Sequence, residues 1–135
     1  MNTNLELIKE WVKALRSGKY TQGQDCLRGK DDKFCCLGVL CDLTSRKKWD
    51  EENDEYYCTI LGEEEVLPES ILNLLHLEER TPSFKISLEN PKLLEILKNY
   101  KEEDRVYYDD LIQLNDIWKL DFNQIADILE EEFLK

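Results

Sequence analysis

The sequence predicts a mainly α fold within the α+β class: a single compact helical domain, residues 1–135, with a small two-stranded β element. A length of 135 residues is typical of one domain. Apolar residues recur at helical spacing in several segments, and polar cap residues mark where those segments begin and end. Only two short segments are rich in residues that favour strands, so we expect a small β part.

The first predicted helix covers residues 3–18. Thr3 is expected to cap it, and Glu6 three residues later completes a capping box. Gly18 supplies the stop signal. The apolar positions that recur every three or four residues are Leu5, Ile8, Trp11, Val12 and Leu15. Residues 19–33 contain two glycines and no apolar period, which predicts a loop.

The segment CCLGVLCDLTSRKK, residues 35–48, predicts the second helix. At about 100° per residue, its apolar side chains cover more than half of the circumference. A helix that is apolar over so wide an arc is expected to be central and buried. Gly38 has no side chain and would permit the close approach of another backbone.

The two segments that favour strands are residues 56–61 (YYCTIL) and 84–87 (FKIS), which are candidates to pair with each other. Between them, Pro68 opens a short helix. The residues of that helix predicted to face inward are Ile71, Leu72 and Leu75.

Cap residues define the remaining helices. Asn90 is expected to cap a helix whose first residue is Pro91. A further helix ends near Asn115. After a short turn, Asp121 caps the last helix and Gln124 completes its capping box.

Composition narrows the class of protein. The amino terminus has neither the basic nor the apolar region of a signal peptide, and no apolar run approaches the ~20 residues of a membrane span. The chain has five cysteines, an odd number, and their spacing does not suggest a secreted disulfide scaffold. We therefore expect a cytoplasmic protein with reduced thiols and no membrane partner.

Charge is distributed unevenly along the chain. Residues 1–49 carry ten Lys and Arg against six Asp and Glu, a balance of +4. Residues 50–135 carry eight against twenty-four, a balance of −16, and the sum is the net charge of −12. This pattern indicates a basic region on an acidic body. Direct binding to nucleic acid is disfavoured, because such binding depends on neutralising phosphates.

Two kinds of site are considered for the cysteine-rich stretch FCCLGVLCDL, residues 34–43: a metal site and a thiol nucleophile. Its cysteine spacings do not match those of a zinc site, so we expect no metal and no other cofactor. A thiol at a helix amino terminus can be activated, with Gln22 as an oxyanion donor and Asn115 as an orienting amide. The set resembles, in outline, that of papain-like hydrolases. The only histidine is His76, in the context NLLHLEE of a helix flank, and burial would raise a thiol pKa.

Four ordered motifs carry a broader resemblance: WVKALRSGKYTQGQDCLR, FCCLGVLCDL, LPESI and LIQLNDIWKLDFNQIADILEEEF. Together they resemble a family of small proteins of unknown function that is common in phages and prophages. The resemblance implies an accessory protein that acts in the cytoplasm of a bacterial host. Members of the family have a glycine in the turn after Asn115 and Asp116, where this chain has Ile117, Trp118 and Lys119.

The first functional hypothesis is a non-enzymatic binder that sequesters a small anionic, nucleotide-derived host defence signal. Basic loop residues and the free N–H groups of a buried helix suit phosphate, and Tyr20 or Trp49 would stack a base. Nanomolar sequestration needs about −12 kcal/mol, more than two arginines supply, which favours a homo-oligomer. The candidate ligand-binding residues are Arg16, Lys19, Tyr20, Gln22, Arg28, Cys35, Cys36, Asn115 and Asp116.

Two other hypotheses stay open. The acidic half, with the runs DEENDE (50–55) and EEDRVYYDD (102–110), suits a nucleic-acid mimic that inhibits a host protein. The third is a cysteine-dependent enzyme that uses Cys35 or Cys36.

Overall fold

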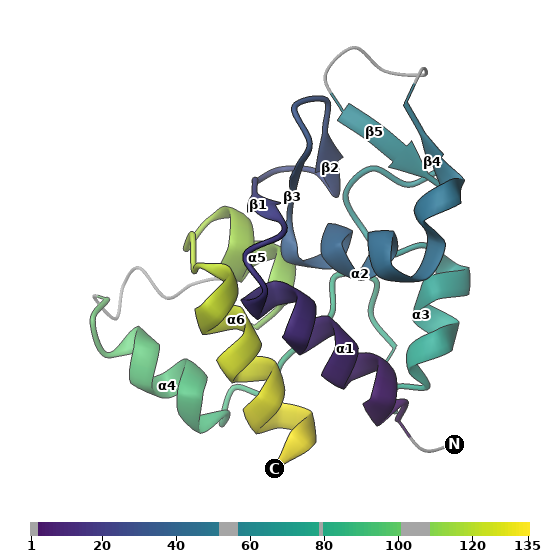
Figure 1. Cartoon of the computed structure of the whole chain (residues 1–135). Helices are drawn as coiled ribbons and strands as arrows, with labels where there is room; N and C mark the ends of the chain where they lie inside the picture. Colours follow the sequence, from purple (N-terminus) through teal and green to yellow (C-terminus); the bar gives the residue numbers. More distant parts are fainter. Residues whose placement is uncertain (1–2, 52–56, 79, 101–108) are drawn as a thin grey trace.

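The computed structural model describes residues 3–51, 57–78, 80–100 and 109–135 (Figure 1). The α-helices in this part of the chain are α1 (Leu5–Arg16), α2 (Cys36–Ser45), α3 (Glu69–Leu75), α4 (Pro91–Leu97), α5 (Leu111–Asp116) and α6 (Phe122–Leu129). The strands are β1 (Thr21–Gln22), β2 (Arg28–Gly29), β3 (Lys33–Phe34), β4 (Trp49–Asp50) and β5 (Tyr57–Ile60). A 3-10 turn, η1 (Arg46–Lys48), follows α2, and a π-helical turn, η3 (Glu130–Leu134), follows α6.

The prediction of a mainly α domain with a two-stranded β element is wrong. The fold is α+β, and its strands form one five-stranded mixed sheet in the order β1-β3-β2-β5-β4. β1 and β3 are parallel, and the other neighbours are antiparallel. Every strand except β5 is two residues long, which is too short to give an alternating sequence pattern.

The predicted loop 19–33 and the predicted strand 84–87 also need correction. The loop contains β1, β2 and the first residue of β3. Residues 84–87 do not pair with β5 and make only an isolated bridge, between Lys85 and Asp110. β5 occupies most of the predicted strand 56–61, of which residue 56 lies outside the described residues.

Helix α2 lies at the centre of the structure, between the sheet and α1 in the view of Figure 1. Every residue from Cys36 to Asp42 is buried, which confirms the predicted central helix. A Cβ atom on Gly38 would overlap the carbonyl oxygen of Leu27, so the predicted close approach of two backbones is also confirmed. Helices α1 and α6 run side by side across the same core (Figure 1).

Most helix ends match the caps predicted from the sequence. Asp121 and Gln124 form the capping box of α6, and Asn90 caps α4 with Pro91 at its first position. The cap of α1 is Asn4 rather than Thr3. Asn4 is fixed there because its backbone N–H also donates to the carbonyl of Leu75, 2.8 Å away on α3.

The turn between α5 and α6 holds a residue in the left-handed region. Lys119 has φ +55°, a conformation that glycine adopts more readily. None of the described helices is long and apolar enough to cross a membrane.

Candidate functional site

A cleft of about 540 Å³ opens between the segment after α1, the β2–β3 turn and the end of α2. We call it the Arg28 cleft. Its lining residues are Lys19, Tyr20, Thr21, Arg28, Asp32, Phe34, Asp42, Arg46 and Glu51. Three of the residues predicted to bind a ligand, Lys19, Tyr20 and Arg28, are therefore brought together.

Arg28 is held at the inner side of this cleft by aromatic rings. Its guanidinium carbon lies 5.6 Å from the ring centre of Phe34 and 5.5 Å from that of Trp49, within the range of cation–π attraction. The Arg28 side chain is only 16% exposed. It forms ion pairs with Asp32 at 2.6 Å and with Glu51 at 2.9 Å.

The two carboxylates that pair with Arg28 are far more exposed than Arg28 itself, at 70% for Asp32 and 61% for Glu51. Ion pairs that involve exposed carboxylates contribute only about 0–1 kcal/mol. A carboxylate that leaves Arg28 would return to water at little cost. The guanidinium is thus fixed in position, while its present partners are exchangeable.

Asp42, which also lines the cleft, accepts hydrogen bonds from three side chains. Its carboxylate accepts hydrogen bonds from the Tyr20 hydroxyl at 2.7 Å and from the Trp49 indole N–H at 3.1 Å. It also accepts one from the guanidinium of Arg46 at 2.9 Å. Burial by itself would raise the pKa of Asp42, but the hydrogen bonds from Arg46, Tyr20 and Trp49 outweigh it and lower the pKa. Asp42 is therefore a charged anchor for two aromatic side chains.

The other predicted basic residue, Arg16, does not line the Arg28 cleft. It pairs with Asp127 at 2.6 Å and with Glu130 at 2.9 Å, and so connects α1 to the carboxyl-terminal part of the chain. Lys19 is exposed at the mouth of the cleft.

Gln22, Cys36 and Asn115 meet beneath the surface. The Oδ1 atom of the fully buried Asn115 accepts the Gln22 side-chain N–H at 2.9 Å and the Cys36 backbone N–H at 3.2 Å. Its Nδ2 atom donates to the Gly23 carbonyl at 2.9 Å. The N–H group of Cys36, predicted to be free for a ligand, is thus satisfied by a side chain.

Asp116 lies next to this buried cluster and is half-buried. Its Oδ1 atom accepts a hydrogen bond from the Nδ2 atom of Asn115 at 2.8 Å. Burial raises the pKa of Asp116, against the effect of that hydrogen bond. Asp116 does not line the Arg28 cleft.

The thiols of Cys35 and Cys36 are buried rather than presented to a cleft. Cys35 caps α2, and its sulfur accepts the backbone N–H of Gly38 at 3.4 Å. Burial raises the pKa of the Cys35 thiol to about 12 and also raises that of Cys36. His76 is exposed at the end of α3 and lines a separate hollow. This arrangement does not activate a thiol.

The other predicted chemistry lies partly outside the described residues. Residues 52–55 of the acidic run DEENDE and residues 102–108 of EEDRVYYDD fall there. Within the described ranges, no group of three or more His, Cys, Asp or Glu side chains is arranged to hold a metal ion.

Sequence reasoning named Tyr20 and Trp49 but missed other residues that shape the cleft around Arg28, among them Asp32, Phe34 and Asp42. Asp42 carried the clearest signal, because it is the only charged residue in the otherwise apolar stretch from Phe34 to Leu43. The roles of Phe34 and Asp32 depend on the short strands that the sequence did not reveal.

Comparison with curated proteins and with solved structures finds no match. Residues 1–133 match the model of a family described as a domain of unknown function, DUF8296. Because this match covers nearly the whole chain, the protein belongs to that family.

Proposed function

We propose that this protein is a non-enzymatic binder that sequesters a small anionic, nucleotide-derived ligand in the Arg28 cleft. The observation that carries the proposal is the contrast between a fixed guanidinium and its exposed partners. Arg28 is held over Phe34 and Trp49, whereas the carboxylates of Asp32 and Glu51 are free to move into water. A guanidinium in this setting offers paired N–H donors to a phosphate.

The walls of the cleft support a ligand with an aromatic part. Tyr20 and Phe34 both line it, and Asp42 fixes the Tyr20 ring through its hydroxyl group. A nucleobase gains about 1–3 kcal/mol from stacking on an aromatic side chain. The resemblance to phage and prophage proteins supports a host defence signal as the ligand and the bacterial cytoplasm as the place of action.

The charges of the cleft limit the affinity that one protomer can reach for an anionic ligand. Lys19, Arg28 and Arg46 are balanced by the three carboxylates that line it. Charge-assisted hydrogen bonds contribute about 1.5–3 kcal/mol each, whereas nanomolar binding needs about 12 kcal/mol. Tight sequestration would therefore require stacking and a second protomer, and we propose a homo-oligomer.

The test is calorimetric titration of the freshly purified protein with a panel of mononucleotides and cyclic nucleotides, alongside native mass spectrometry. Arg28→Ala is expected to weaken binding by about 10- to 150-fold, the equivalent of one charge-assisted interaction. Arg16→Ala is the matched control, because Arg16 pairs with Asp127 of α6 and Glu130 of η3, outside the cleft. No binding across the panel, or equal losses in both variants, would refute the proposal.

A further inference from the structure

Within the described residues, segment 85–87 forms a β-bridge along one of its two backbone edges only. On that edge, Ile86 donates its N–H to the Asp109 carbonyl at 2.7 Å, and the Phe84 carbonyl accepts from Leu111 at 3.0 Å. These two bonds flank the antiparallel bridge between Lys85 and Asp110. Because successive residues of a strand point their backbone groups in alternate directions, those of Lys85 and Ser87 face the opposite way.

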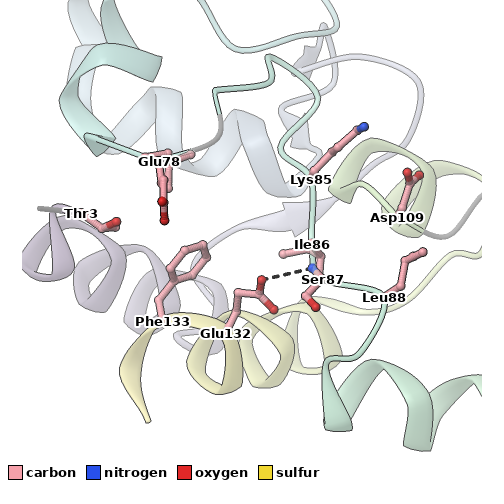
Figure 2. A pocket seen from close by; sticks show the side chains of 10 residues that line it. Thr3, Glu78, Lys85, Ile86, Ser87, Leu88, Asp109, Glu132 and Phe133 are labelled. Carbon is pink, nitrogen blue, oxygen red and sulfur yellow. Dashed lines mark hydrogen bonds between the residues drawn. The ribbon is translucent and has the colours of Figure 1, made fainter. Parts of the chain in front are cut away.

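The opposite side is a hollow of about 630 Å³ (Figure 2). Its apolar lining comes from Leu77, Ile86, Leu88 and Phe133. Leu88 is 51% exposed at its rim. Phe133 is fixed by an edge-to-face contact with the buried Phe84, with ring centres 5.9 Å apart.

Side chains take the place of a neighbouring strand on this edge, where the Oγ1 atom of Thr81 accepts the Lys85 N–H at 2.9 Å. Glu132 accepts the Ser87 N–H at 3.1 Å, as the dashed line in Figure 2 marks. Within the described ranges, no donor bonds to the carbonyl of Lys85. The carbonyl of Lys85 and the N–H of Ser87 are the two groups that a parallel strand opposite Ile86 would bond.

Charge indicates the kind of strand that would fit. Four charged residues line the hollow, namely Glu78, Lys85, Asp109 and Glu132, and the side chain of Glu78 points toward it (Figure 2). The one lysine therefore does not offset the three carboxylates. A partner with a basic side chain would complement them.

We infer that this hollow binds an extended, basic peptide segment of a partner protein by strand addition beside residues 85–87. The segment replaces Glu132 as the acceptor for the Ser87 N–H and donates to the Lys85 carbonyl. One of its apolar side chains packs against Leu77 and Phe133. Main-chain bonds and one side-chain pocket are the usual basis of such recognition. This site is separate from the Arg28 cleft.

The experiment is a ¹⁵N NMR titration of the full chain with three acetylated, amidated pentapeptides: Lys-Val-Lys-Val-Lys, Glu-Val-Glu-Val-Glu and Lys-Val-Pro-Val-Lys. The first is expected to shift the amides of Ile86, Ser87 and Leu88 in a saturable way below about 1 mM. The acidic peptide lacks the complementary charge, and the proline peptide lacks a ladder N–H. Neither should reproduce these shifts.

Glu78→Gln is expected to weaken binding of the basic peptide by about threefold, the size of one exposed charge pair. Glu10→Gln, on the exposed side of α1, is the matched control and should change nothing. Arg28→Ala should also leave peptide binding intact, which separates this inference from the proposed function. Equal binding of all three peptides, or no shift at these amides, would overturn it. Concentration-dependent shifts of the same amides without peptide would also overturn it, in favour of a second copy of the chain.

Discussion

Asn115 shows how a single side chain can hold distant parts of the chain together. Its amide satisfies the Cys36 N–H, 79 residues away, and the Gly23 carbonyl, 92 residues away. The sequence identified Asn115 as a candidate site residue. It did not reveal that Asn115 is a buried connector, because both contacts depend on how β1 and α5 come together around α2.

Replacing Asn115 with alanine is therefore expected to lower the free energy of unfolding by about 2–4 kcal/mol, because two buried backbone groups lose their partner. Urea denaturation followed by circular dichroism measures this change. Asn123→Ala is the matched control, since Asn123 is exposed on the first turn of α6, and it should change stability by less than about 0.5 kcal/mol. Similar stabilities for the two variants would contradict the role given to Asn115.

The cysteines give a second prediction for single residues. Burial raises the pKa of the Cys26 thiol to about 11, with a further contribution from Asp116, and that of Cys35 to about 12. Near neutral pH, far less than about 1% of either thiol is then ionised. Because thiolates are the reactive form, native protein should react with dithionitrobenzoate much more slowly than protein in urea.

Cys26 is expected to react first, because it is the half-buried one of the free cysteines, the others being buried. Mass spectrometry after partial labelling identifies the modified residue. If native protein rapidly releases one equivalent of thionitrobenzoate and the label is found on Cys35 or Cys36, the result would instead favour the cysteine-dependent enzyme.

At the scale of elements, cap residues and apolar spacing predicted the helices well. Asp121 with Gln124, and Asn90 with Pro91, mark their helices with purely local signals. The sheet left no such signal, because residues 21–22, 28–29 and 33–34 gain their β structure from pairing with each other and with β5. Residues of β1, β2 and β3 line the Arg28 cleft, so the cleft depends on this sheet. Its basic residues Lys19 and Arg28 could be predicted, but the contribution of Arg46 and the shape of the cleft could not.

The contact between α2 and the segment before β2 provides a prediction for these elements. Gly38→Ala places a methyl group against the carbonyl of Leu27, which already accepts the Cys35 N–H at 3.2 Å. Neither backbone can move away without losing that bond, so we expect a loss of about 3 kcal/mol or more in the free energy of unfolding.

Gly62→Ala is the control for this substitution. Gly62 has φ +85° but faces open space, so alanine there adds only the strain of a left-handed residue, about 1–2 kcal/mol. Chemical denaturation of both variants gives the comparison. A Gly38→Ala protein as stable as the Gly62→Ala protein would show that α2 does not lie this close to Leu27.

At the scale of the whole molecule, the basic and the acidic half of the sequence contact each other through ion pairs. Helix α1, from the basic half, runs beside α6 from the acidic half (Figure 1), and Arg16 pairs with Asp127 of α6 and with Glu130 of η3. These ion pairs are partly exposed and contribute little individually. The net charge of −12 acts in the other direction, because self-repulsion opposes the compact state.

The two effects predict opposite responses to salt, so salt decides which is larger. Raising NaCl from about 20 mM to about 0.5 M shortens the screening length severalfold and weakens attraction and repulsion alike. Because repulsion acts across the whole acidic body, whereas the exposed ion pairs are worth about 0–1 kcal/mol each, we expect the thermal midpoint to rise. Differential scanning calorimetry measures this midpoint.

The double variant Glu10→Gln, Glu89→Gln changes the net charge from −12 to −10 without removing an ion pair in the described residues, and its thermal midpoint should depend less on salt. A midpoint that falls with NaCl would mean that attraction between the basic and acidic halves outweighs the repulsion within the acidic one.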